Sequence, residues 1–323
     1  MSHSRISTAI EDGLLVLPAG QITLMRPPGD YDVGALARDR VLISQGYYPD
    51  FARWSDAGYS VTARPEPATV AIVVVPRSKT LARSMVAQAA SWAQLVVVDG
   101  QRTDGVDGLF KDCRKRIGDI ASIPKGHGRI FWFDGTDAFA DWIAPPPAKG
   151  PHGYFTTAGV FSDGAVDKGS ALLAQSLPDK LPARLADLGA GWGYLAAPAL
   201  SRSGVKSLDL IEAEALSLDC ARLNVTDPRV TFHWADATTF TPQTAYDGIV
   251  MNPPFHTGRA AEPQLGRAFI ASAARVLASH GKLWMVANRH LPYEQALRDH
   301  FRNVEEIAGS SAFKVFHATR PIR

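Results

Sequence analysis

An amide, two prolines and an aromatic ring stand together in the segment Asn252-Pro253-Pro254-Phe255. Proline fixes φ and donates no backbone hydrogen bond, so the carbonyls of this segment are available to a ligand. The Asn252 side-chain oxygen and the Pro253 carbonyl are suited to accept both hydrogens of an exocyclic amine, while Phe255 stacks on the ring. We predict that these four residues are catalytic and handle an amine-bearing base. The competing interpretation is a rigid turn after a buried strand.

A glycine-rich segment lies about 65 residues upstream of this tetrad, after an apolar strand expected over 184–188. Glycines allow positive φ and close approach of the backbone to a ligand. Their spacing, G-x-G-x-G after an aspartate, differs from the G-x-G-x-x-G of dinucleotide sites. Asp187 would repel a pyrophosphate but suits the α-ammonium group of S-adenosylmethionine, which therefore ranks above NAD as the cofactor. The predicted cofactor-binding residues here are Asp187, Gly189, Ala190, Gly191 and Gly193.

Further acids follow the next two expected strands. The strand 207–212 ends at Glu212, 25 positions after Asp187, where doubly wound folds place a carboxylate on ribose hydroxyls. An exposed acid opening a helix is the alternative interpretation of Glu212. The strand 229–234 precedes Asp236 and Ala237, and we expect Asp236 to accept the adenine amino group. All of these residues, with the tetrad, fall at carboxyl ends of strands, where open α/β sheets bind ligands.

The glycine-rich segment together with Asn-Pro-Pro-Phe-His256-Thr-Gly258 resembles the class I ribosomal RNA guanine-N2 methyltransferases of the RsmC and RlmG type. A second stretch, 158–162 followed by Asp167-Lys168-Gly169-Ser170, is similar to the segment that precedes the catalytic domain of that family and helps close over the cofactor. The resemblance implies cofactor contacts from Asp167, Gly169 and Asn252, and a substrate contact from His256. It implies S-adenosylmethionine-dependent methylation of a guanine N2 amine, with 16S RNA of the small subunit as the expected substrate.

Other functions stay open on the sequence. Related Asn-Pro-Pro-Phe or Asn-Pro-Pro-Tyr loops act on adenine N6 and on glutamine side chains, and the large-subunit 23S RNA is an alternative guanine-N2 substrate. A non-catalytic ribosome assembly factor with a retained fold is a further alternative, although a binding module needs neither cofactor loop nor amine tetrad. An NAD-dependent oxidoreductase would need the G-x-G-x-x-G pattern.

The length of 323 residues corresponds to two domains, with the proline run at 145–147 as the boundary. In the first half, apolar strands expected over 70–75 and 95–98 flank a helix expected over 79–92, which is a βαβ pattern. A further strand is expected over 129–133, but this half lacks both the glycine-rich loop and the tetrad. We therefore predict an α/β protein of two tandem Rossmann-like class I methyltransferase domains, 1–145 and 152–323, of which the first is degenerate and assists with RNA.

The formal net charge of +2 and the pI near 8.5 give mild support to an RNA partner. Several cations of the first half could meet phosphates, and the stretch 76–79 is similar to a Pro-Lys-Ser-Lys element of the family. An ordinary solvated helix face is the competing interpretation, because Asp112 interrupts the run. The candidate RNA contacts are Arg77, Lys79, Lys111, Arg114, Lys115 and Arg116.

The two cysteines, Cys113 and Cys220, lie in different expected domains without metal-ligand spacing, so neither a disulfide framework nor a metal site is indicated. No apolar segment reaches the roughly 18 to 20 residues that a membrane helix needs, and the N-terminal segment lacks the apolar run of a signal peptide. We expect a cytoplasmic protein without metal or membrane contact. The internal duplication favours a monomer.

Overall fold

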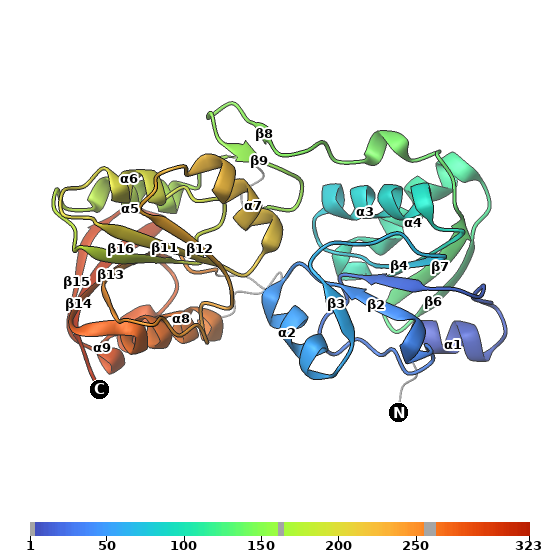
Figure 1. Ribbon diagram of the computed structural model, residues 1–323, viewed down its shortest axis with the longest axis horizontal. Coiled ribbons are helices and arrows are strands. Elements are labelled where there is room, and N and C mark those ends of the chain that lie inside the picture. The colour runs from blue at the N-terminus through green and yellow to red at the C-terminus, as the bar shows by residue number, and fades with distance from the viewer. Residues whose placement is uncertain (1–3, 161–164, 255–262) are drawn as a thin grey trace. The chain divides into compact units, whose positions relative to one another are not determined.

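The computed structural model describes residues 4–160, 165–254 and 263–323. Phe255 and His256 of the predicted site therefore lie outside the described residues. The chain divides into two compact units, Met1–Pro146 and Pro147–Arg323, and the division falls within the proline run at 145–147. Figure 1 labels the elements of both units. Each unit is an α/β structure built on one mixed sheet, which confirms the expected fold class.

The first unit contains a seven-stranded sheet of order β3-β2-β1-β4-β5-β7-β6, in which β7 runs antiparallel to both of its neighbours. Helices α3 and α4 lie on one face and α1 and α2 on the other (Figure 1). Its strands are β1 (Ile22–Met25), β2 (Val41–Ser44), β3 (Ser60–Thr62), β4 (Val70–Val74), β5 (Leu95–Gln101), β6 (Ala121–Lys125) and β7 (Gly128–Asp134). Its helices are α1 (Arg5–Glu11), α2 (Tyr48–Asp56), α3 (Lys79–Trp92) and α4 (Val106–Ile117), with 3-10 turns at Arg38–Arg40, Arg102–Asp104 and Ala140–Trp142.

The second unit repeats this arrangement in the order β12-β11-β10-β13-β14-β16-β15, with β16 antiparallel to its neighbours. Helices α5, α6 and α7 cover one face and α8 and α9 the other (Figure 1). Its main strands are β10 (Arg184–Leu188), β11 (Ser207–Glu212), β12 (Val230–Trp234), β13 (Tyr246–Met251), β14 (Leu277–Asn288), β15 (Phe301–Gly309) and β16 (Phe313–Pro321), preceded by a short ribbon of β8 (Ala148–Lys149) and β9 (Phe155–Thr156). Its helices are α5 (Lys168–Ser176), α6 (Ala196–Leu200), α7 (Ala215–Asn224), α8 (Pro263–Val276) and α9 (Tyr293–His300).

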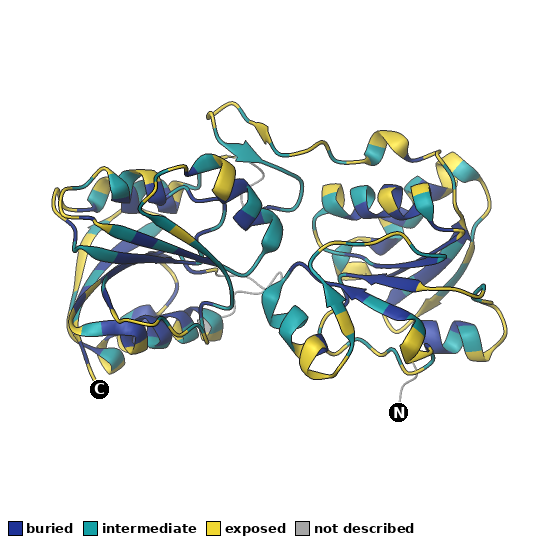
Figure 2. Ribbon diagram, viewed as in Figure 1, coloured by how far each residue is buried: buried dark blue, intermediate teal, exposed yellow. Residues whose placement is uncertain are grey.

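Burial follows from the residue types of the strands. The central strands are buried on both faces and carry near-continuous apolar runs, as in Val70–Val74 and Leu95–Val98, which parallel strands covered by helices require. Figure 2 shows the same contrast, with buried strands and helices that expose only their outer sides. Two apolar clusters in the second unit, one on each face of its sheet, hold β10 and β13 in place between them. The loops at the carboxyl ends of these strands therefore stand on a rigid support.

None of the helices in the described part of the chain is long and apolar enough to cross a membrane. Within the same residues, no cluster of three or more histidine, cysteine or acidic side chains could hold a metal ion. Cys113 and Cys220 are free, buried thiols of different units. Burial raises the pKa of Cys113 to about 12 and that of Cys220 to about 11, so both thiols are packing groups and poor nucleophiles at neutral pH.

Candidate cofactor and amine site

The three glycines after β10 all have positive φ, at 76° for Gly189, 57° for Gly191 and 85° for Gly193. They differ in surroundings. A Cβ on Gly189 would lie 3.2 Å from the Phe269 ring, and one on Gly193 would lie 3.0 Å from Val225, so these two permit close packing. A Cβ on Gly191 would meet no described atom within 4 Å. Gly191 is therefore the glycine of this loop that borders open space where a ligand can approach.

Glu212 stands at the end of β11 and is held against the glycine loop. Its Oε2 accepts a hydrogen bond of 2.7 Å from the backbone N–H of Gly191, and its Oε1 accepts one of 2.7 Å from the N–H of Glu214. Burial raises the pKa of Glu212, while these backbone donors act in the opposite direction. The carboxylate is thus fixed in orientation beside the open space at Gly191, as a ribose ligand requires.

Asp187 is the most unusual group of the loop. The residue is 1% exposed, and neither carboxylate oxygen has a hydrogen-bond partner among the described residues. Burial, followed by the charge of Glu212, raises the pKa of Asp187 to about 8. A buried carboxyl group without a partner is costly unless a ligand completes it. Its chemistry fits a cationic donor such as an ammonium group.

Asp236 and Ala237 follow β12 and differ in what they can offer a cofactor. The Asp236 Oδ1 accepts hydrogen bonds from the Thr238 N–H at 2.8 Å and from the Thr238 hydroxyl at 2.7 Å, which fixes the turn. Ala237 is 4% exposed, its methyl group belongs to the core, and its carbonyl accepts from the Ser272 hydroxyl at 2.6 Å. The Asp236 carboxylate therefore stays the candidate for the adenine amine, whereas the Ala237 side chain packs in the core.

Asn252 follows β13 directly and is partly buried. Its Nδ2 donates to the Asp167 Oδ2 at 2.9 Å and to the Ser170 hydroxyl oxygen at 2.8 Å. Pro253 is buried and Pro254 is exposed. The Pro254 Cδ lies 4.0 Å from the position of a Cβ on Gly189, so the tetrad and the glycine loop adjoin.

Asn224 is a residue that the sequence did not single out. Its Nδ2 donates to the carbonyls of Phe155 at 3.0 Å and Trp192 at 2.9 Å, and its Oδ1 accepts from the Phe155 N–H at 2.7 Å. Beside it, Tyr154, Trp192 and Tyr194 form an aromatic cluster. One amide at the end of α7 therefore joins the segment that precedes α5 to the glycine loop. The sequence signal was weak, because an asparagine at a helix end is common.

The predicted RNA-binding cations lie in the first unit, and local acids engage several of them. Arg114 pairs with Asp119 at 2.9 Å, and Arg116 pairs with Asp141 and stacks over the Trp142 ring. Arg77 lies 3.6 Å from Asp104, and Lys79 lies 3.5 Å from Asp112. Lys111 and Lys115 are exposed on α4. Surface pairs of this kind are weak, so they leave the cations able to exchange their partners for phosphates. The RNA role of these residues stays a prediction.

The turn after β1 in the first unit has the same backbone conformation as the glycine loop after β10 but carries different side chains. The N–H of Arg26 donates to the Ser44 carbonyl at 2.7 Å, as the N–H of Gly189 donates to the Ile211 carbonyl at 2.9 Å. Arg26 has a φ of 54°, so it keeps the left-handed conformation of Gly189. Sheet register agrees, because β1 pairs with β2 through Met25 and Ser44 as β10 pairs with β11 through Leu188 and Ile211.

This correspondence places Gln45 at the position of Glu212. The Gln45 Oε1 accepts from the Tyr47 N–H at 2.9 Å, which matches the bond between Glu212 and Glu214. The second contact is reversed. The Gln45 Nε2 donates to the Pro27 carbonyl at 2.7 Å, whereas Glu212 accepts from the N–H of Gly191.

Other positions of the site have also changed in the first unit. Pro28 stands at the position of Gly191 and has no N–H to offer. Register further places Leu24 where the second unit has Asp187, and Val74 where it has Asn252. The first unit therefore has no acid at the position of Glu212, no carboxylate at that of Asp187 and no amide at that of Asn252.

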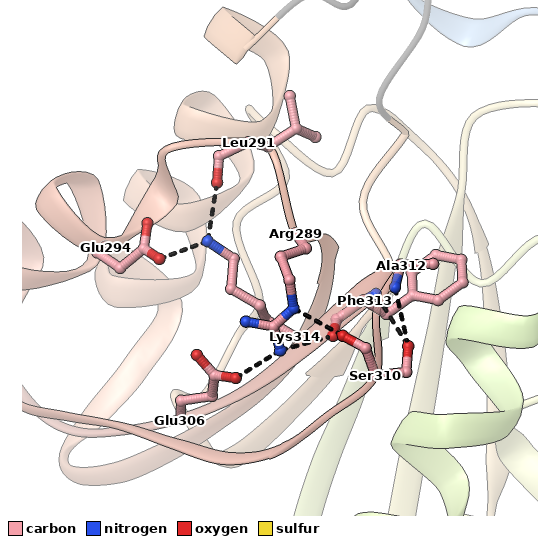
Figure 3. Close-up of polar contacts among 8 residues, drawn as sticks. All are labelled: Arg289, Leu291, Glu294, Glu306, Ser310, Ala312, Phe313 and Lys314. Atoms are coloured by element: carbon pink, nitrogen blue, oxygen red, sulfur yellow. Dashed lines mark hydrogen bonds and ion pairs between the residues drawn. The ribbon is translucent and has the colours of Figure 1, made fainter.

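A partly buried ion pair occurs in both units. Lys314 on β16 is 5% exposed, and its Nζ donates to the Leu291 carbonyl at 3.3 Å and to the Glu294 carboxylate (Figure 3). Sheet register places Arg129 of β7 at the position of Lys314, and its Nε lies 2.8 Å from the Oδ1 of Asp107 in the first turn of α4. Because such a pair also occurs in the unit that lacks the glycine loop, we expect it to serve the fold.

Comparison with known proteins agrees with this geometry. A family profile described as "Methyltransferase small domain" matches residues 153–317. The ribosomal RNA small subunit methyltransferase C of Hahella chejuensis is 28% identical to this chain over 94% of it and 95% of the relative. That of Shewanella sp. strain MR-4 is 31% identical over 76% of this chain and 75% of the relative.

Among solved structures, the T. thermophilus 16S rRNA N2 G1207 methyltransferase (RsmC), in complex with AdoMet and guanosine, has a TM-score of 0.79 at 22% identity. The match covers 98% of this chain and 92% of the T. thermophilus chain, so both units share its fold. With the family profile and the curated relatives, these matches carry one conclusion. This chain belongs to the methyltransferase small-domain family, among the ribosomal RNA small subunit methyltransferases C.

Proposed function

We propose that this protein uses S-adenosylmethionine to methylate the exocyclic N2 amine of a guanine in the 16S RNA of the small ribosomal subunit. The observation that carries the proposal is the contact between Pro254 of the tetrad and Gly189 of the glycine loop, the loop in which Gly191 borders open space. The names of the relatives support the ribosomal RNA substrate. The AdoMet and guanosine held by the T. thermophilus protein support the cofactor and the target base.

The residues present fit S-adenosylmethionine. Asp187 would accept from the ammonium group, because its buried carboxylate oxygens have no described partner. Glu212 would hold the ribose hydroxyls, and Asp236 would accept from the adenine amine. When bound, the cofactor supplies an electrophilic methyl group on a sulfonium centre.

The chain's part in the reaction is to prepare the amine. The lone pair of guanine N2 is delocalised into the ring, which makes the nitrogen a weak nucleophile. The Asn252 Oδ1 and the Pro253 carbonyl accept its two hydrogens, which draws the nitrogen toward sp³ geometry and aims the lone pair at the methyl group. From its residue type alone, Phe255 would stack on the base after the base has left its RNA stack. Alignment supplies most of the rate enhancement, and the extra proton leaves to water after methylation, when the amine is cationic.

Transfer of labelled methyl from S-adenosylmethionine tests the proposal. Small subunits, large subunits and protein-free ribosomal RNA from cells lacking the gene serve as substrates, with nucleoside mass spectrometry as readout. We expect N2-methylguanosine in small subunits, and a loss of at least about a hundredfold for Asn252→Ala with cofactor binding retained. Label in large subunits only, or as N6-methyladenosine, would refute the substrate. A normal rate for Asn252→Ala would refute the role of the amide.

A monomeric protein that contacts RNA through its first unit is part of the same proposal. The exposed Lys111 and Lys115 and the paired Arg114 and Arg116 support it, since all four cations lie on α4 and three of them in its last turn. Phosphate contacts make binding strongly dependent on salt. Replacing both lysines by glutamine should therefore weaken RNA binding and reduce the salt slope, while leaving cofactor affinity unchanged.

A further inference from the structure

The Asn252 amide has two ends of similar shape and opposite hydrogen-bonding character. Its oxygen accepts hydrogen bonds, whereas its NH₂ group donates them. An exocyclic amine presents N–H donors, so only the oxygen can serve it. If the amide turned by 180°, two donors would face each other in the site. Something in the protein must select the productive orientation.

The structure supplies that selection from α5. The Asn252 Nδ2 donates to the Asp167 Oδ2 at 2.9 Å and to the Ser170 Oγ at 2.8 Å. A carboxylate only accepts hydrogen bonds, so a reversed amide would place its oxygen against the Asp167 oxygen. We propose that Asp167 and Ser170 are positioning residues that hold Nδ2 and thereby turn the Asn252 Oδ1 toward the substrate amine. The inference rests on the proposed function and deepens it.

Asp167 is itself held in place by the start of α5. It is the N-cap of this nine-residue helix, and its Oδ2 also accepts from the Ser170 N–H at 2.7 Å. Gly169 lets Asp167 and Phe313 come close to the helix backbone, because a Cβ on this residue would lie 3.0 Å from the Asp167 Oδ2 and 3.0 Å from the Phe313 ring. Gly169, predicted from the resemblance to contact the cofactor, thus has a packing role beside Asp167.

Phe313 is in turn fixed by the turn between β15 and β16. The N–H of Phe313 donates to the Ser310 Oγ at 3.1 Å. Arg289 donates to the Ser310 carbonyl at 2.6 Å, to the Phe313 carbonyl at 3.2 Å and to Glu306 at 2.8 Å (Figure 3). A continuous set of contacts therefore runs from this turn through Phe313 and α5 to Asn252. Locked supporting residues of this kind are what precise catalytic geometry needs.

Two substitutions at Asp167 separate positioning of the amide from capping of the helix. Serine and asparagine both cap helices well, so α5 should persist in Asp167→Ser and Asp167→Asn. Asparagine offers an oxygen at the position of Oδ2, which can still accept from Asn252. The serine hydroxyl lies one bond closer to the backbone and cannot reach it. Asp179→Ser, at a fully exposed aspartate of the same unit, is the matched control.

We expect kcat of Asp167→Ser to fall on the order of tenfold or more, because the amide is no longer oriented. We expect Asp167→Asn to stay near the wild-type kcat, and the cofactor Kd of both variants, measured by calorimetry, to stay within about twofold. Wild-type kcat in Asp167→Ser would overturn the inference. A matched loss of cofactor affinity in both variants would also overturn it, in favour of a direct cofactor contact. If the wild-type protein transferred methyl to none of the ribosomal RNAs, the proposed function would be overturned. The positioning of Asn252 toward a substrate amine would then be overturned as well.

Discussion

Replacing Asp187 by asparagine should stabilise the ligand-free protein and weaken its hold on the cofactor. The wild-type carboxyl group is buried without a described partner, and its pKa is raised to about 8, against about 3.9 in an unfolded chain. The folded state therefore keeps a proton that the unfolded state releases. Stability from this proton is fully present below pH ~4 and is lost as the pH rises through about 8.

The size of this stability change follows from the difference between the folded and unfolded pKa values. At 1.36 kcal/mol per pKa unit, the folded wild-type protein loses about 1–2 kcal/mol of stability at pH 5 and about 5 kcal/mol at pH 8, relative to a group that never ionises. Asparagine is such a group and has nearly the same shape. The stability advantage of Asp187→Asn over wild type should therefore widen by about 3–4 kcal/mol between pH 5 and pH 8.

Urea unfolding without cofactor, at both pH values, measures this difference, with exposed Asp179→Asn as the control. In the binding arm, calorimetry should show S-adenosylmethionine affinity reduced about tenfold to a hundredfold in Asp187→Asn, since a charged hydrogen bond is lost. An advantage that does not change with pH would refute the burial argument. Unchanged affinity would refute the assignment of Asp187 to the ammonium group.

Three further substitutions probe other parts of the second unit. Gly191→Trp should abolish cofactor binding in calorimetry without unfolding the protein, because its side chain enters open space; tight binding would show that the loop has been misread. Lys314→Met should lower the unfolding free energy by about 1–3 kcal/mol through loss of the bonds to Leu291 and Glu294, with kcat unchanged; a large fall in kcat would contradict a purely structural pair. Asn224→Ala should speed chymotryptic cleavage near Phe155, because three hydrogen bonds to Phe155 and Trp192 disappear; a wild-type cleavage rate would mean that the aromatic cluster alone fixes the segment.

Much of the fold follows from local patterns in the sequence. The helix over 79–92 and the strand over 207–212 have the expected bounds, since apolar periodicity and strand runs record local structure directly. The order of the acids along the chain also placed Asp187, Glu212 and Asp236 at one edge of the sheet. Carboxyl ends of adjacent parallel strands meet there whatever the loop sequences are.

Contacts between distant residues could not be predicted in the same way. Asp167 and Asn252 are 85 positions apart, and their bond depends on how α5 packs against the sheet. The glycine loop gives a second example. Sequence spacing does not distinguish Gly189, Gly191 and Gly193. In the structure, Gly189 packs closely against Phe269 and Gly193 against Val225, whereas Gly191 borders open space.

Because the hydrogen bond of Gln45 is reversed relative to that of Glu212, no single substitution would convert the loop after β1 into the glycine loop of the second unit. Gln45→Glu alone would set a carboxylate against the Pro27 carbonyl, two acceptors with no proton between them. Pro28→Gly alone would restore an N–H but leave no acid to receive it. Each single change is therefore unfavourable while the pair would be compatible, so the two loops are alternative hydrogen-bond arrangements that no single substitution interconverts.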